Sequence, residues 1–221
     1  MKWEYIQPVT IRFGEGIVKE VKDVAASMGC KRGILVSDPF FLTNGLADKI
    51  VKDSDGTLVC VYGEVSPNPE VKEVDACAKL IRENDIEFVV ALGGGSALDC
   101  AKASATMCFR EGESVRTYHG TGVPMPQKHL PLIAVPTTDH ELGKKGPIVS
   151  NGFYPSIAMI DPELTYTLPP RITASTGIDV LCHALEGFWS KGHQPVCDAL
   201  ALHACEIVFK YLRRAYKDPQ D

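Results

Sequence analysis

The strongest chemical signal in this sequence is a glycine run at the end of an apolar segment. Residues 88–92 (FVVAL) are apolar, and residues 93–96 (GGGS) follow directly before a helical pattern. A strand that leads into glycines at the start of a helix lets backbone N–H groups approach a phosphate, which the helix dipole also attracts. An ordinary tight turn between a strand and a helix needs only one glycine. The spacing fits neither GxGxxG nor a P-loop, and we interpret the run as a phosphate-binding turn.

An aspartate follows an earlier apolar segment in a similar way. Residues 33–36 (GILV) predict a strand, and Asp38 comes just after it. In a dinucleotide-binding domain, an acidic residue at such a place accepts hydrogen bonds from a ribose 2′-OH and repels a 2′-phosphate. An aspartate that caps the N-terminus of a helix is the alternative. The residues alone leave both interpretations open.

A carboxylate and an imidazole are spaced four residues apart in TGIDVLCHALE, at Asp179 and His183. On a helix they share one face, where mixed oxygen and nitrogen donors suit iron, zinc or manganese. For an isolated pair of this kind, a hydrogen bond without a metal is the commoner outcome. No Ser/His/Asp or Cys/His set stands out, so the sequence assigns no catalytic side chain.

The elements that must position these residues alternate between strands and helices. Strands are predicted at 10–13, 33–36, 57–62, 88–92, 132–135 and 157–160, and helices at 17–28, 46–51, 71–84 and 97–107. This alternation predicts an α/β fold with a parallel sheet, whose ligands sit at the carboxyl ends of the strands. After the double proline 169–170 the strand signals stop, and helices are predicted at 175–190 and 195–216. The double proline therefore marks a domain boundary.

Composition excludes several classes of protein. The chain has 221 residues, a net charge of −5 and 45% hydrophobic residues, which is ordinary for a globular protein of one or two domains. No basic block suggests nucleic-acid binding, no apolar run is long enough for a membrane span, and the N-terminus does not resemble a signal peptide. None of the eight cysteines forms a CxxC pair, so we expect reduced thiols and a cytoplasmic location.

Several motifs occur in a fixed order along the chain. They are RFGEG (12–16), ILVSDP (34–39), VSPNPE (65–70), GGGSALDCAK (93–102), LIAVPTT (132–138), IDPELTYTLPP (160–170), ASTGIDVLCHALEGFWS (174–190) and PVCDALALHA (195–204). Together they resemble the iron-containing (group III) alcohol dehydrogenases, and the segment 93–102 is similar to the family pattern GGGSxxDxAK. The resemblance covers nearly the whole chain.

The resemblance implies an enzyme of two domains that interconverts an alcohol and an aldehyde or ketone with NAD(H). It implies a Rossmann-like dinucleotide-binding domain at 1–170 and the first helices of an all-helical metal and substrate domain at 171–221. A homodimer is also expected. The implied cofactor contacts are Asp38, Asn68, Gly94, Gly95, Ser96, Asp99, Thr137, Thr138, Lys145 and Leu168.

The same resemblance favours NAD over NADP, because of the position of Asp38. It makes Asp179 and His183 the first two metal ligands, and so reverses the preference for a pair without a metal. Fe(II) is the expected ion, with Zn(II) or Mn(II) as alternatives. The metal would bind the substrate oxygen as a Lewis acid.

The sequence departs from the family pattern in two places. A piece of the family sequence is expected to be missing after Thr138, and the family's other two metal ligands would lie beyond Asp221. We therefore expect partly uncovered apolar faces on the last two helices. A truncated, catalytically inactive nucleotide-binding fragment is one alternative function. A relative of glycerol dehydrogenase or dehydroquinate synthase is another, although Asp38 and residues 176–190 fit the alcohol dehydrogenases better.

Overall fold

The computed structural model of the protein describes residues 2–137 and 153–220. Among these residues the chain divides into two compact units. One holds residues 8–137 and 153–162, and the other holds residues 2–7 and 163–220. The division falls inside a short 3₁₀-helix, η4 (Pro162–Thr165). A functional boundary after residue 170 remains a prediction.

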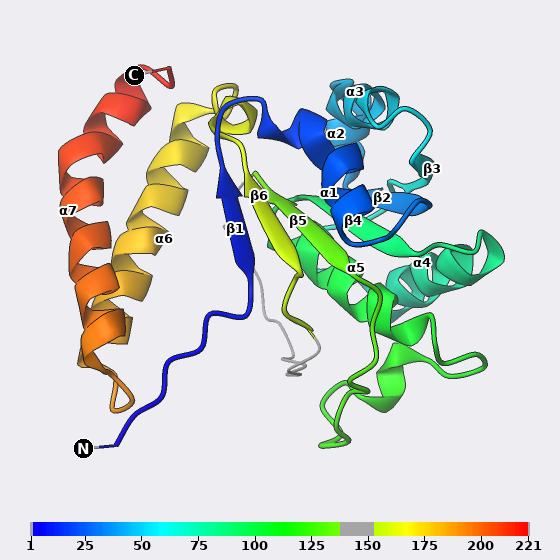
Figure 1. Cartoon of the computed structure of the whole chain (residues 1–221). Helices are drawn as coiled ribbons and strands as arrows, with labels where there is room; N and C mark the ends of the chain where they lie inside the picture. The colour runs from blue at the N-terminus through cyan, green and yellow to red at the C-terminus, as the bar shows by residue number, and fades with distance from the viewer. Residues whose placement is uncertain (1, 138–152, 221) are drawn as a thin grey trace. The chain divides into compact units, whose positions relative to one another are not determined.

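The first unit is built on one sheet of six parallel strands, which confirms the predicted α/β fold. The strand order is β1-β6-β5-β4-β2-β3 (Figure 1). The strands are β1 (Thr10–Phe13), β2 (Gly33–Ser37), β3 (Leu58–Tyr62), β4 (Phe88–Gly93), β5 (Leu132–Pro136) and β6 (Ile157–Ile160). Its helices are η1 (Ile17–Glu20), α1 (Val21–Ser27), α2 (Pro39–Thr43), α3 (Leu46–Asp53), α4 (Val71–Glu83), α5 (Gly95–Met107) and η2 (Val115–Thr117).

The two central strands β2 and β4 are buried along their whole length. Parallel strands covered on both faces are expected to be almost continuously apolar, as GILVS and FVVALG are. Gly33 pairs with Phe88 in register, and a Cβ atom at position 33 would overlap the Phe88 ring. This close approach explains the glycine at the start of β2.

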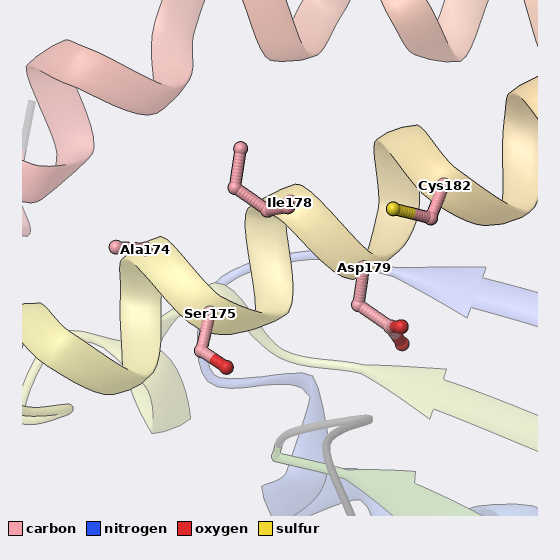
Figure 2. Close-up of a pocket in the computed structure, with 5 residues that line it drawn as sticks. All are labelled: Ala174, Ser175, Ile178, Asp179 and Cys182. Atoms are coloured by element: carbon pink, nitrogen blue, oxygen red, sulfur yellow. The ribbon is translucent and has the colours of Figure 1, made fainter.

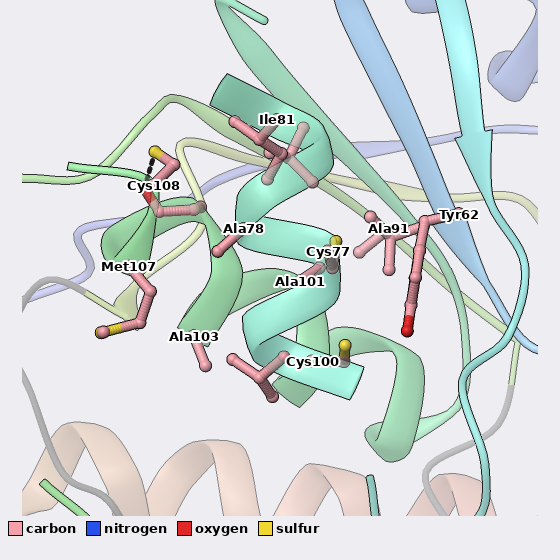
Figure 3. Packing of buried hydrophobic residues seen from close by; sticks show 14 of the residues in the cluster. Tyr62, Cys77, Ala78, Ile81, Ala91, Cys100, Ala101, Ala103, Met107 and Cys108 are labelled. Atoms are coloured by element: carbon pink, nitrogen blue, oxygen red, sulfur yellow. Dashed lines mark hydrogen bonds between the residues drawn. The ribbon is translucent and has the colours of Figure 1, made fainter. Parts of the chain in front are cut away.

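Successive side chains of these strands point to opposite faces of the sheet. Ile34 and Ala91 belong to one core cluster. Figure 3 shows Ala91 in this cluster with Cys77 and Ala78 of α4 and Ala101 of α5. Helix α5 is rich in alanine on its buried positions, and small side chains let a helix lie close to the sheet. The strong burial of this layer holds the carboxyl ends of β2 and β4 in fixed positions.

The second unit contains two long helices, α6 (Pro170–Trp189) and α7 (Pro195–Lys217), which pack against each other. A Cβ atom at Gly177 of α6 would overlap the Leu212 side chain of α7. Large apolar side chains remain exposed on both helices, including Trp189 and Phe209. The expected uncovered apolar faces are therefore present. In the part of the chain that the structure describes, no helix combines the length and hydropathy needed to cross a bilayer.

Several observed helices differ from the predicted ones. The segment predicted as one helix at 17–28 begins as the 3₁₀-helix η1, whose N-cap Gly16 has a left-handed backbone (φ 70°), and continues as α1. Helix α2 was not predicted, since five residues are too few to show a helical period. Helix α6 begins at Pro170, five residues earlier than expected. Proline suits the first turn of a helix, where its missing N–H is not needed.

Candidate functional site

The order of the strands creates a natural ligand site between β2 and β4. From β2 the chain adds β3 on one side, and β4, β5 and β6 follow in turn on the other side. The direction of sheet growth therefore reverses beside β2. In open parallel sheets, ligands bind outside the carboxyl ends of the strands at such a reversal. The residues that follow β2 and β4 are Asp38 and the glycine turn.

Asp38 is both a helix cap and a neighbour of the glycine turn. Its Oδ1 accepts a hydrogen bond from the Phe40 backbone N–H at 2.9 Å, which caps α2. Its Oδ2 lies 3.2 Å from the point where a Cβ atom of Gly93 would stand. Burial raises the pKa of the Asp38 carboxyl, and the amides of Phe40 and Phe41 act in the opposite direction. The helix cap uses one carboxylate oxygen, so it does not exclude the ribose interpretation.

Gly93 closes β4 in a conformation that favours glycine, with φ at 140°. A Cβ atom there would lie 2.9 Å from the Ala97 Cβ, a separation that real side chains do not tolerate. Gly94 is the N-cap of α5, and Gly95 and Ser96 form the first turn. The first backbone N–H groups of a helix have no partner within the helix, and they attract an anion together with the dipole. The predicted phosphate-binding turn therefore has the backbone arrangement that it requires.

Two further loops reach the same edge of the sheet. The Asn68 backbone N–H donates to the Ser96 Oγ at 3.1 Å, and Asn68 has a left-handed backbone (φ 56°). The Thr137 backbone N–H donates to the Gly93 carbonyl at 3.1 Å. Thr137 is buried, and its Oγ1 has no hydrogen-bond partner among the described residues. A buried hydroxyl normally has a partner, so this oxygen is suited to a polar ligand.

The four other predicted cofactor residues fall on α5, in the second unit or outside the described residues. The Asp99 carboxylate is half-exposed on α5 and lies 3.8 Å from the Lys102 Nζ. Leu168 belongs to the second unit, where its backbone N–H donates to the Thr165 carbonyl. Thr138 and Lys145 lie outside the described residues, as does the place where a family segment is expected to be missing.

The predicted metal pair lies on α6. The His183 Nδ1 is 3.5 Å from the Asp179 Oδ2, and both side chains are accessible to solvent. A pocket of about 420 Å³ is lined by Ala174, Ser175, Ile178, Asp179 and Cys182, all on α6 (Figure 2). Within residues 2–137 and 153–220, no group of three or more His, Cys, Asp or Glu side chains could hold a metal. Catalytic metal sites usually supply three protein ligands, so the described donor set is incomplete and we derive no reaction step through a metal.

One residue of the site, Gly93, and one structural residue at the same sheet edge, Asp161, were not predicted. Gly93 was seen only as part of the glycine run, although its positive φ and its approach to Asp38 set it apart. Asp161, directly after β6, is buried and accepts from the backbone N–H groups of Gly16 and Val18 at 3.0 and 3.2 Å. An aspartate at the carboxyl end of a strand was the available signal. Its role is structural, because it ties the loop after β1 to the end of β6.

Models of two parts of one protein family match this sequence. The model for iron-containing alcohol dehydrogenase matches residues 8–140, and the model for the C-terminal part of the Fe-containing alcohol dehydrogenase family matches residues 173–221. Alcohol dehydrogenase 4 of Saccharomyces cerevisiae (strain YJM789) is 34% identical over 233 residues, which cover 98% of this chain and 60% of the yeast protein. The sulfoacetaldehyde reductase of Bilophila wadsworthia is 30% identical, over 92% of this chain and 56% of its own.

A solved structure is considerably more similar. It is the sulfoacetaldehyde reductase from Bifidobacterium kashiwanohense in complex with NAD+, with 55% sequence identity and a TM-score of 0.94. The match covers 100% of this chain and 62% of that chain. This chain thus spans about 60% of the length of its relatives. Since one family model alone matches more than half of the sequence and the fold agrees, the chain belongs to the iron-containing alcohol dehydrogenase family.

Proposed function

We propose that this chain binds NAD(H) at the carboxyl edge of its sheet and serves an oxidoreductase that interconverts an alcohol and an aldehyde. The main support is that Asp38 lies close to the Gly93 turn at the carboxyl ends of β2 and β4, where the order of the strands reverses. We assign dinucleotide binding to residues 1–170 and metal and substrate binding to the domain that begins at residue 171. NAD(H) supplies the hydride chemistry, while the protein binds and orients.

The contacts are assigned by chemistry. Gly94, Gly95 and Ser96 offer the N-terminus of α5 to the pyrophosphate, and Asp38 accepts from the ribose hydroxyls. Asn68 and Thr137 are proposed as further contacts, since their backbone N–H groups hydrogen-bond to Ser96 and Gly93 of the glycine turn. We retain Asp99, Thr138, Lys145 and Leu168 as proposed contacts on the family resemblance alone. A negative Asp38 disfavours a 2′-phosphate, so NAD is proposed over NADP.

We propose Asp179 and His183 as two ligands of a divalent metal. Their support is the donor chemistry of the pair and its position on an exposed face of α6. Fe(II) is proposed on the family name, with Zn(II) and Mn(II) as alternatives that the same donors accept. The alternative is that Asp179 and His183 only form a hydrogen bond with each other and bind no metal.

For the substrate we propose a short aldehyde that carries a sulfonate, namely sulfoacetaldehyde. The support is the 55% identity to a protein of that activity, well above the 34% identity to the yeast alcohol dehydrogenase. The reaction takes up one hydride and one proton at the carbonyl and yields the corresponding alcohol. Butanal, an uncharged aldehyde, is the matched comparison.

The test is to follow the absorbance of NADH with the purified chain and each aldehyde, after measuring NADH and NADPH binding by calorimetry. We expect NADH to bind more tightly than NADPH, and sulfoacetaldehyde to be reduced with the higher kcat/KM. Binding of NADH without turnover of either aldehyde would support the inactive nucleotide-binding alternative. Equal affinities for NADH and NADPH would contradict the role of Asp38, and no binding of NADH would overturn the proposed function.

We also propose a cytoplasmic location and a homodimer. All eight cysteines are free thiols, and the four buried ones lie in the first unit, which contains the sheet. Free thiols suit a reducing compartment. The exposed apolar side chains of α6 and α7 offer surface that association could cover. Analytical ultracentrifugation of the reduced protein would measure the oligomeric state.

A further inference from the structure

We propose that Phe40 forms the adenine-facing wall of the cofactor site, with its ring packed against the adenine base. This inference rests on the proposed binding of NAD(H) and adds a contact to the adenosine half of the dinucleotide. It concerns residues of the sheet-bearing unit alone.

The backbone fixes Phe40 relative to the proposed ribose acceptor. The Phe40 N–H donates to the Asp38 Oδ1 at 2.9 Å, and Pro39 begins α2 between them. In NAD(H) the adenine base is attached to the same ribose that carries the 2′-OH. A side chain that directly flanks the ribose acceptor is therefore within reach of the base.

The ring of Phe40 is supported from behind by a second aromatic ring. Phe41 is buried, and its Cε2 lies 3.7 Å from the point where a Gly93 Cβ would stand. The Phe40 ring packs edge to face on Phe41, with centroids 5.1 Å apart and an interplanar angle of 81°. This is a favoured geometry for an aromatic pair. Phe40 thus packs on Phe41, and Phe41 lies beside the position of Gly93 in the glycine turn.

Phe40 is nevertheless open to solvent, with 57% of its surface exposed. A single exposed phenylalanine is ordinary on a protein surface, but Phe40 also lies beside Asp38, the proposed ribose acceptor. The residues of α2 (PFFLT) carry no charge, which suits an uncharged base. Nucleic-acid bases stack readily on exposed aromatic rings because every base has a π-face. Adenine is the part of NAD(H) that this surface fits.

The experiment compares binding of NADH and ADP-ribose to the full chain and to three variants. Phe40→Ala and Phe40→Leu remove the ring, whereas Phe40→Tyr keeps it. We expect Phe40→Ala and Phe40→Leu to raise the dissociation constants of NADH and ADP-ribose by about tenfold, within the range for loss of base–aromatic stacking. Phe40→Tyr should bind both ligands as tightly as the unaltered chain does. Phe13→Ala is the control, because it removes another exposed ring of the same unit from β1, the outermost strand on the side of the sheet away from β3.

A purely structural effect through Asp38 has a different signature. Adenine is common to NADH and NADPH, so loss of an adenine contact leaves their affinity ratio unchanged, whereas displacement of Asp38 shifts it. Unchanged NADH binding in Phe40→Ala, or a shifted NADH to NADPH ratio, would overturn the inference while leaving the proposed function intact. Failure of the unaltered chain to bind NADH would overturn both.

Discussion

Gly93 lets two strands bring their functional groups together. Its φ of 140° and the short distances from its missing Cβ to Ala97 and Asp38 leave no room for a side chain. We predict that Gly93→Ala lowers the free energy of unfolding by about 1–3 kcal/mol, the typical range for a strained backbone. The same change should weaken NADH binding, because the Asp38 carboxylate must move. Urea unfolding and calorimetric titration with NADH measure the two effects.

Gly14→Ala is the matched control, since position 14 has open space around a Cβ and no positive φ. It should leave both quantities nearly unchanged. If Gly93→Ala also had no effect on either quantity, the close approach of Asp38 to the glycine turn would be refuted. The glycine run itself was visible in the sequence. That approach was not, because it depends on β2 lying beside β4 and not on their separation along the chain.

Among the helices, the packing of α6 against α7 depends on Gly177. A Cβ at Gly177 would overlap Leu212, so we predict that Gly177→Ala destabilises the helix pair by about 1–3 kcal/mol through overpacking. Adding Leu212→Ala should recover much of this loss, because it makes room for the new methyl group. Thermal unfolding of the full chain, followed by circular dichroism, measures the change.

Gly187→Ala on the same helix provides the contrast, as nothing lies near its Cβ. There alanine should stabilise by up to about 1 kcal/mol, through helix propensity alone. Equal effects at positions 177 and 187 would argue against this packing. The long helices and buried strands were predictable because their hydrophobic periods persist over many residues. The five-residue α2 was not, and neither was the 3₁₀ start of the segment after Gly16.

In the molecule as a whole, the sheet edge at Asp38 and Gly93 and the proposed metal ligands belong to different compact units. The Asp38 and Gly93 edge lies in residues 8–137 and 153–162, and Asp179 and His183 lie in residues 163–220. The two binding events should therefore be separable. We predict that His183→Ala lowers bound metal, measured by elemental analysis, and lowers aldehyde reduction, while the NADH dissociation constant changes less than about twofold, a difference below 0.5 kcal/mol.

Chelation of the unaltered protein should reproduce this pattern, and added Fe(II), Zn(II) or Mn(II) would show which ion restores activity. His203→Ala, which removes an exposed imidazole from α7, controls for the general loss of a histidine. If the unaltered chain carries no metal, Asp179 and His183 are a hydrogen-bonded pair and the metal assignment fails. If His183→Ala weakens NADH binding as much as it lowers bound metal, the two sites are coupled, and binding cannot be assigned to the separate units.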